Sequence, residues 1–233
     1  MEKLGFLLSG GKDSLFAAYL MRKRGYDLKC AIIIQSENTA SYMFHTPNTD
    51  IAKVQAECMN LPFVEGHTQG VKEEELKDLY NALKEARETY GVEGVVTGAI
   101  FSEYQSQRIQ KVSDELGLKV YSPLWHMNQE EEMRALLKEG FTFVFSSVAA
   151  YGLDKSWVGR IIAEKDIDRL VELNKKYGIN IAGEGGEFES LVLDCPLFFK
   201  AIELSDCQIK KEDENTAYFK VGQAKTYKKQ HIR

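Results

Sequence analysis

Apolar runs and amphipathic segments alternate along the first 127 residues of the chain. Residues 4–8 and 28–34 are apolar runs of strand length, and the second is rich in β-branched side chains, as in strands covered on both faces of a parallel sheet. Between them, residues 14–24 carry apolar side chains at helical spacing and end at Gly25. This alternation predicts βαβ units and a doubly wound parallel sheet of the α/β class. The other predicted elements of this part are helices at residues 50–60, 72–90 and 104–116 and strands at residues 62–65, 94–98 and 119–121.

The pattern loosens after residue 127, where we place a domain boundary, with residues 1–127 as the nucleotide-binding domain. Two strand-like runs within residues 201–221 surround the polar turn KKEDENT and predict a hairpin. The basic end of the chain, residues 225–233, is typical of a loose tail. We expect residues 128–233 to form a smaller C-terminal α+β domain that binds substrate. Its remaining predicted elements are helices at residues 129–139 and 166–177 and an apolar run at residues 141–148.

Composition narrows the classes of function. The 233 residues carry a net charge of −5 with a pI near 5.5, which gives no overall attraction to nucleic acid or to an anionic membrane. No signal peptide is recognisable, and no run approaches the roughly 20 apolar residues of a membrane span. The four cysteines form no Cys-x-x-Cys pair, and the four histidines lack zinc-ligand spacing. We therefore expect a cytoplasmic protein without disulfides, zinc or an iron–sulfur cluster.

The first predicted strand ends in the sequence SGGKDS, and a helical pattern follows at once. A glycine-rich turn between a strand and a helix brings backbone N–H groups and the positive end of the helix dipole to one point, which is an anion site. Lys12 adds a mobile positive charge suited to phosphate oxygens. The carboxylate of Asp13 would repel phosphate unless a cation lies between them, and Mg²⁺ is the simplest such cation. The candidate phosphate-binding residues are Ser9, Gly10, Gly11, Lys12, Asp13 and Ser14, with Asp13 as the metal ligand.

The spacing within this loop indicates the class of nucleotide site. Gly11 stands where a Walker A loop has its lysine, and the dinucleotide fingerprint Gly-x-Gly-x-x-Gly is absent here. Ser-Gly-Gly-x-Asp-Ser after a first strand instead resembles the PP-loop of the N-type ATP pyrophosphatases. The resemblance implies a Rossmann-like nucleotide-binding fold whose loop holds the β- and γ-phosphates of ATP. These leave as pyrophosphate while the adenylyl part activates a substrate oxygen. The structural alternative is an ordinary βα turn.

Three further parts of the chain resemble one PP-loop family, the diphthine–ammonia ligases. They are SYMFHT at residues 41–46, GAIFSEYQSQR at residues 98–108 with the later PLW and NQEEE, and GLDKSWVGR with GEGGEFESLVLDCPLF at residues 183–198. The glycine–glutamate stretch is the most specific, because other PP-loop families do not carry it. The sequence departs from the family at Phe188, where tyrosine is common, and at Ser106 and Gln107, where a basic and an apolar residue are common.

This resemblance implies a reaction and its partners. ATP activates the carboxylate of diphthine on translation elongation factor 2 as an acyl-adenylate, ammonia attacks, and AMP leaves as the amide of diphthamide forms. No membrane and no direct nucleic acid contact is implied, and pairing of copies through the second domain is left open. The residues that we assign to catalysis are Lys12, Asp13, Glu187 and Glu189.

Two more groups of residues complete the predicted ATP site. Predicted strands end at residues 98–100 and near Ile34, on the carboxyl edge of the sheet, where an open α/β sheet binds its ligand. Backbone at residues 98–100 would reach the ribose or the α-phosphate, and Ile34 would form a wall for adenine. The alternatives are a plain βα turn and core packing. The ATP-binding candidates added here are Ile34, Gly98, Ala99 and Ile100.

The predicted acceptor is a cation, because diphthine carries a trimethylammonium group and the co-substrate is ammonia or ammonium. Carboxylates and aromatic faces are the expected lining for cations. The glycine–glutamate stretch supplies three carboxylates, for which the alternative is a solvated acidic turn. The candidate aromatics are Tyr42, Phe188 and Trp125, with core packing as their alternative. A polar helix face that is merely solvated is the alternative for residues 104–108. The substrate-binding candidates are Tyr42, His45, Tyr104, Gln105, Arg108, Glu184, Glu187 and Glu189.

Three other functions stay open at this point. A PP-loop enzyme that modifies tRNA would carry a basic face, and its thiolating branch would need paired cysteines, neither of which the sequence favours. A ligase that amidates a small acid would use the same adenylate chemistry with free ammonia. A non-catalytic ATP sensor would share the loop but would have no need of an acceptor pocket lined for a cation.

Overall fold

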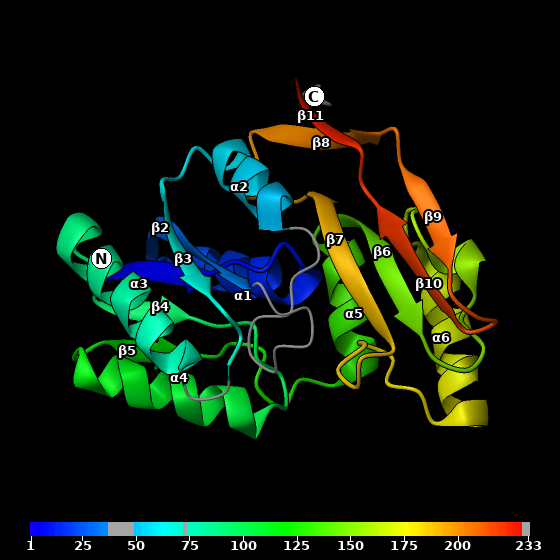
Figure 1. The fold of residues 1–233 in the computed structure, drawn as a ribbon, viewed down its shortest axis with the longest axis horizontal. Helices are drawn as coiled ribbons and strands as arrows, with labels where there is room; N and C mark the ends of the chain where they lie inside the picture. The colour runs from blue at the N-terminus through cyan, green and yellow to red at the C-terminus, as the bar shows by residue number, and fades with distance from the viewer. Residues whose placement is uncertain (37–48, 72–73, 230–233) are drawn as a thin grey trace. The chain divides into compact units, whose positions relative to one another are not determined.

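The computed structural model describes residues 1–36, 49–71 and 74–229. Contacts divide the chain into two compact units, Met1–Trp125 and His126–Arg233 (Figure 1). The candidate residues Tyr42 and His45 lie outside the described residues. Among the described residues, no helix is both long enough and apolar enough to cross a membrane.

The first unit is built on a five-stranded parallel sheet. Its strands are β1 (Lys3–Leu7), β2 (Asp27–Ser36), β3 (Phe63–Thr68), β4 (Gly94–Val96) and β5 (Lys119–Tyr121). They are ordered β3-β2-β1-β4-β5, so that the direction of strand addition reverses between β1 and β4 (Figure 1). The loops that follow β1 and β4 therefore flank the switch point at which open α/β sheets bind their ligands. The predicted doubly wound α/β fold is confirmed.

Helices cover both faces of this sheet. They are α1 (Lys12–Lys23), α2 (Thr49–Cys58), α3 (Glu75–Tyr90) and α4 (Glu103–Glu115). In β2, Cys30 and Ile32 pack in one core cluster with side chains of α3 and α4. Ala31 and Ile33 point to the opposite face and are equally buried, on the side of the sheet where α1 and α2 contact β2. This burial on both faces is why the strands are continuous apolar runs in the sequence.

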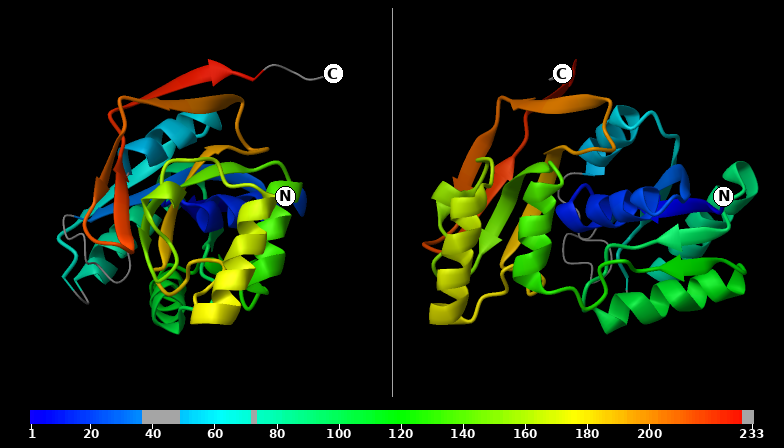
Figure 2. Two further views of the ribbon diagram at one scale, coloured as in Figure 1. Left: turned by 90° about the vertical axis from the view of Figure 1, so that its right-hand side faces the viewer. Right: turned by 180° about the vertical axis from the view of Figure 1, so that it is seen from behind.

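The second unit has two antiparallel sheets, ordered β7-β6-β10-β9 and β11-β8. The strands are β6 (Thr142–Ala149), β7 (Phe188–Asp194), β8 (Lys200–Ser205), β9 (Gln208–Lys211), β10 (Thr216–Lys220) and β11 (Gln223–Lys228). The helices are α5 (Gln129–Lys138), α6 (Glu164–Tyr177) and the 3₁₀ turn η1 (Lys155–Trp157). Figure 2 shows α5 and α6 side by side, where Arg134 of α5 pairs with Glu164 at 2.9 Å and Asp168 at 2.8 Å. The predicted α+β character of this part is confirmed.

Two expectations for the end of the chain need correction. The predicted hairpin exists as β9 and β10, but the first strand-like run breaks at Asp206, whose φ of 54° turns the chain. The separate strand β8 pairs antiparallel with β11, which supplies partners for its backbone N–H and C=O groups. Residues 225–228 therefore belong to β11, and the prediction of a loose tail is wrong for them.

The glycine–glutamate stretch also has more regular structure than a turn. From Phe188 onward it is strand β7, which pairs antiparallel with β6. The Phe188 ring is 4% exposed and stacks on Phe145 with the ring centroids 3.9 Å apart. Core packing, rather than the lining of a cation site, accounts for this aromatic side chain.

Candidate functional site

The loop at residues 9–14 joins β1 to α1 and is held by its own serines. Ser14 Oγ donates to the Gly11 carbonyl at 3.1 Å and accepts from Ser9 Oγ at 3.1 Å. Gly10 has a φ of 87°, which glycine adopts without strain, and the extended residue Gly11 is the N-cap of α1. The loop thus brings its backbone to the positive end of the α1 dipole, which is the geometry predicted for an anion site.

Lys12 and Asp13 form an ion pair in the first turn of α1. The Lys12 side chain is 1% exposed, whereas that of Asp13 is 28% exposed. A buried ammonium at the positive end of a helix is unfavourable without a negative partner. The Asp13 carboxylate is that partner here, and phosphate oxygens are the other kind of partner that the position suits.

The turn after β4 approaches this loop very closely. A Cβ atom on Gly98 would lie 2.7 Å from the Asp13 carbonyl carbon and 2.7 Å from the Ser14 nitrogen. No other residue fits without moving one of the two backbones. The next residue, Ala99, donates its N–H to Thr97 Oγ1 at 3.2 Å, and Ile100 is fully buried. The structure therefore brings the predicted residues 98–100 together with the 9–14 loop at the switch point of the sheet.

Gln55 of α2, which is not among the predicted site residues, also holds the loop. Its Nε2 donates to the Gly10 carbonyl at 3.0 Å, and the side chain is 0% exposed. The signal that could have found it is local. Gln55 lies in the buried stripe of α2 with Ile51, Ala52 and Ala56, where a polar side chain requires a partner.

Ile34 lies in β2 and is 5% exposed. Its side chain belongs to the core cluster with Val64 of β3 and Leu79 of α3. The Ile34 side chain, which we predict as a wall for adenine, is thus packed in the core of the first unit.

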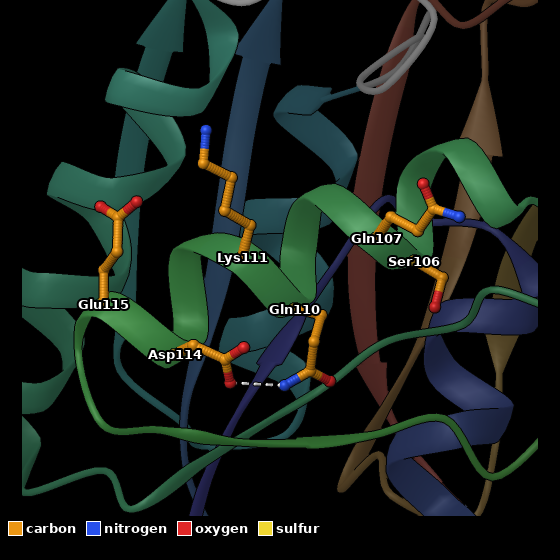
Figure 3. A pocket seen from close by; sticks show the side chains of 6 residues that line it. All are labelled: Ser106, Gln107, Gln110, Lys111, Asp114 and Glu115. Atoms are coloured by element: carbon orange, nitrogen blue, oxygen red, sulfur yellow. Dashed lines mark hydrogen bonds between the residues drawn. The ribbon is translucent and has the colours of Figure 1, made fainter.

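At the start of α4, the candidates Tyr104 and Arg108 contact each other. The guanidinium carbon of Arg108 lies 3.4 Å from the centroid of the Tyr104 ring, and its NH1 donates to the Tyr104 carbonyl at 3.4 Å. Gln105 donates its backbone N–H to the N-cap Ser102 at 3.4 Å. Farther along, α4 carries a polar surface hollow in which Gln110 Nε2 donates to Asp114 Oδ1 at 2.7 Å (Figure 3). The residues that line it are Ser106, Gln107, Gln110, Lys111, Asp114 and Glu115.

In the second unit, the Glu187 carboxylate closes its own loop. Its Oε1 accepts from the Asn180 N–H at 2.8 Å, and its Oε2 accepts from the Gly185 N–H at 2.8 Å. Its carbonyl accepts from the Ala149 N–H at 2.8 Å, which attaches the loop to the end of β6. The side chain of Glu187 thus organises residues 180–187.

The other two glutamates of this stretch lie differently. Glu184 is exposed at the turn, and Glu189 is half-buried in β7 opposite Ser147. The expectation that Glu187 and Glu189 point the same way depended on an extended chain, but β7 begins only at Phe188. The three carboxylates are near one another in sequence, and that of Glu187 accepts hydrogen bonds from two backbone N–H groups.

Both units match domains of one family. Residues 2–120 match the family described as Diphthamide synthase N-terminal domain, and residues 128–227 match Diphthamide synthase C-terminal domain. The chain belongs to the diphthamide synthase family. The predicted family is confirmed, and the two domain matches cover nearly the whole chain rather than the 9–14 loop alone.

Relatives of this diphthamide synthase family member carry the name Diphthine--ammonia ligase. The one from Rattus norvegicus is 34% identical over 219 residues, which cover 86% of this chain and 82% of the relative. The one from Danio rerio is 37% identical over 215 residues, which cover 84% of each. The one from Schizosaccharomyces pombe is 35% identical over 238 residues, which cover 95% of this chain and 39% of the relative. The chain thus spans well under half the length of the fission yeast relative and most of the length of the other two.

Two cysteines of this diphthamide synthase family member are unsuited to thiolate chemistry at neutral pH. Burial raises the pKa of Cys30 to about 12 and that of Cys195 to about 12. The thiolate is the reactive form of cysteine, so thiols with such pKa values stay protonated and inert. These two thiols are therefore unsuited to carry sulfur in a thiolation reaction.

The GLDKSWVGR stretch has a packing role in the second unit. Arg160 pairs with Asp166 of α6 at 2.8 Å, and its guanidinium carbon lies 4.8 Å from the Trp157 ring. Asp154 accepts from the Ser156 N–H at 2.8 Å, and the hydrogen bonds from Ser156 hold the pKa of Asp154 below its ordinary value. The contacts of Arg160 thus connect η1 to α6.

Proposed function

We propose that this chain is a diphthine–ammonia ligase, which uses ATP to join ammonia to the diphthine carboxylate of translation elongation factor 2. The products are diphthamide, AMP and pyrophosphate. The observation that carries the proposal is the contact of the 9–14 loop with Gly98 at the switch point of the sheet, in a chain of the diphthamide synthase family. A translation factor as acceptor places the reaction in the cytoplasm.

The β- and γ-phosphates of ATP bind at the 9–14 loop. Backbone N–H groups at the start of α1 supply hydrogen bonds, and Lys12 supplies a buried positive charge. Negative charge develops on the pyrophosphate as it leaves, so a preorganised ammonium stabilises the transition state more than the ground state. The backbone at residues 98–100 takes the α-phosphate and ribose, since its approach to Asp13 leaves it beside the loop.

Mg²⁺ fits this arrangement as a partner of ATP. The ion is commonly held by one or two carboxylates together with the phosphate oxygens of a substrate. In the part of the chain that the structure describes, no group of three or more His, Cys, Asp or Glu side chains forms a ready-made metal site. Asp13, which is partly exposed beside the loop, is the residue that would hold the ion with the phosphates. The ion would supply neutralisation of phosphate charge.

The reaction takes place in two steps, adenylation of the carboxylate and formation of the amide. A carboxylate oxygen of diphthine attacks the α-phosphorus of ATP, and the bond to the bridging oxygen of pyrophosphate breaks. The nitrogen of ammonia then attacks the acyl carbon, loses a proton, and displaces AMP. Glu184 and Glu189 attract the cationic acceptor and ammonium, while Glu187 keeps their loop in place. Tyr42, His45, Tyr104, Gln105 and Arg108 stay assigned to substrate binding.

The test is an assay of AMP and pyrophosphate formation with ATP, Mg²⁺, ammonium and elongation factor 2 that carries diphthine. We expect AMP only when all components are present, and none when the factor lacks diphthine. ATP binding without turnover in the complete mixture would favour a sensor. Turnover with a small carboxylic acid in place of the factor would favour a small-acid ligase.

A further inference from the structure

The buried stripe of α2 contains one polar side chain. Ile51, Ala52 and Ala56 form the apolar part of the stripe, and Gln55 lies among them at 0% exposure. Burying a primary amide without hydrogen bonds is costly, whereas an apolar side chain would fill the same position without that cost. The amide at this position is therefore explained by what it contacts.

The contact reaches the glycine pair of the 9–14 loop from a distant part of the sequence. Gln55 Nε2 donates to the Gly10 carbonyl at 3.0 Å, across 45 positions of the chain. The carbonyl of Gly10 and the N–H of Gly11 belong to one peptide unit, which is planar and trans, so the two groups point in opposite directions. Fixing the Gly10 carbonyl therefore also fixes the direction of the Gly11 N–H at the N-cap of α1.

The local backbone does not fix this peptide by itself. Gly10 has a φ of 87°, and a glycine visits several regions of conformational space at similar free energy. The Gly11 N–H has only a long contact to Ser9 Oγ, at 3.3 Å, which a stronger acceptor such as a phosphate oxygen would replace. The hydrogen bond from Gln55 is the buried, long-range restraint on a flexible pair of residues.

We infer that Gln55 is a positioning residue for the β- and γ-phosphates of ATP, acting by holding the Gly10–Gly11 peptide with its N–H directed into the phosphate site. The inference rests on the proposed function. It adds a residue from α2 to a site that is otherwise built from the loops after β1 and β4. The role is indirect, since Gln55 acts on the backbone and does not touch the nucleotide.

The variant Gln55→Leu removes the donor and keeps a similar side-chain volume in the buried stripe. The matched control is Arg87→Met, which removes another side-chain donor to a distant backbone carbonyl, that of Leu116 at 2.8 Å. Arg87 is in the last turn of α3, just before β4 begins. It therefore lies near the amino ends of the parallel strands, whereas the 9–14 loop lies at their carboxyl ends. Both variants lose a hydrogen bond to a distant backbone carbonyl, but only Gln55→Leu loses a restraint on the loop.

The measurement is a pair of titrations, with α,β-methylene-ATP and with AMP, in the presence of Mg²⁺ and well below the melting temperature of each variant. We expect Gln55→Leu to bind the ATP analogue about three- to tenfold more weakly, the usual effect of one neutral hydrogen bond, and to bind AMP normally. Arg87→Met should bind both ligands as the unaltered protein does. A merely structural role for Gln55 predicts a lower melting temperature with an unchanged ratio of the two affinities.

The two proposals fail separately. If the unaltered protein does not bind the ATP analogue, the proposed function is wrong. If it binds and Gln55→Leu binds equally well, or loses affinity for both ligands in equal measure, the positioning role is wrong. Should Gln55→Leu not fold, Gln55→Asn keeps the buried amide but is one methylene too short to reach Gly10, and it should show the same selective loss.

Discussion

Gly98 lies against the backbone of Asp13 so closely that no side chain fits between them. A Cβ atom at residue 98 would stand 2.7 Å from the Asp13 carbonyl carbon, which is far inside ordinary van der Waals contact. The two residues are separated by 85 positions in the sequence: Asp13 is in the first turn of α1, just after the β1 loop, and Gly98 is in the turn that follows β4. Their contact fixes the spacing between the part of the site that would take the pyrophosphate and the part that would take the adenylyl group.

Replacing Gly98 with alanine should therefore separate the two loops. We expect Gly98→Ala to reduce ATP affinity at least about tenfold, together with a loss of about 1–3 kcal/mol in the free energy of unfolding from overpacking. Gly117→Ala is the control, because its positive φ of 65° makes it costly as well, while nothing lies within 4 Å of the added Cβ. The control should lower the melting temperature and leave ATP binding intact. Equal ATP affinity in the two variants would contradict the role of the contact.

Lys12 is expected to act mainly on the chemical step. Lys12→Met fills the buried position but removes the charge, and we expect the rate of AMP formation to fall about 10²-fold or more, as for the loss of one electrostatic donor to a transition state. The exposed Lys77→Met variant is the control for the loss of a positive charge. Steady-state kinetics of AMP formation for Lys12→Met and Lys77→Met test this difference. Full activity of Lys12→Met would remove the 9–14 loop from the reaction centre.

Asp13 is expected to act through magnesium. Asp13→Asn keeps the size of the side chain but weakens its hold on the ion, so activity should be low at limiting Mg²⁺ and recover in part at high Mg²⁺. The measurement is a magnesium titration of AMP formation for the variant and the unaltered protein. A variant whose activity is equally low at every magnesium concentration would show that the carboxylate has another role.

The fold was predictable from the sequence because its signals are local. Continuous apolar runs such as residues 28–34 arise from burial on both faces of β2, and the glycine pair with Lys12 and Asp13 marks a loop whose chemistry depends on neighbouring residues. The closeness of Gly98 to the loop could also be predicted, since both follow parallel strands that end at the same edge of the sheet.

What could not be predicted depends on contacts between distant residues. The apolar stripe of α2 marks Gln55 as a buried polar residue that needs a partner, but the sequence does not identify that partner, the Gly10 carbonyl 45 positions away. The role of Glu187 depends on the N–H of Asn180, which a short acidic stretch does not reveal. The pairing of β11 with β8 is likewise hidden in the sequence. Most of β11 is exposed, so its residues lack the apolar alternation that would predict a strand.

Glu187 and Glu189 should behave differently on substitution. Glu187→Ala leaves the N–H groups of Asn180 and Gly185 without their acceptor, so we expect a loss of about 1–3 kcal/mol in the free energy of unfolding. Glu189→Ala should change stability less and instead weaken amide formation against ammonium or the acceptor about ten- to hundredfold, with ATP affinity unchanged. Chemical denaturation and an ammonium titration test the two halves. Normal amidation by Glu189→Ala would contradict the role of Glu189 in attracting ammonium or the acceptor.

The most direct measurement follows the nitrogen atom. Isotopically labelled ammonium, ATP and Mg²⁺ are incubated with the protein and elongation factor 2 that carries diphthine, and mass spectrometry of the factor is compared with the amount of AMP formed. We expect one labelled nitrogen on the diphthine residue for each AMP, with both products forming at least about 10²-fold more slowly with Lys12→Met. AMP formed without label on the factor, or label transferred without AMP, would contradict an amide-forming ligase that works through the 9–14 loop.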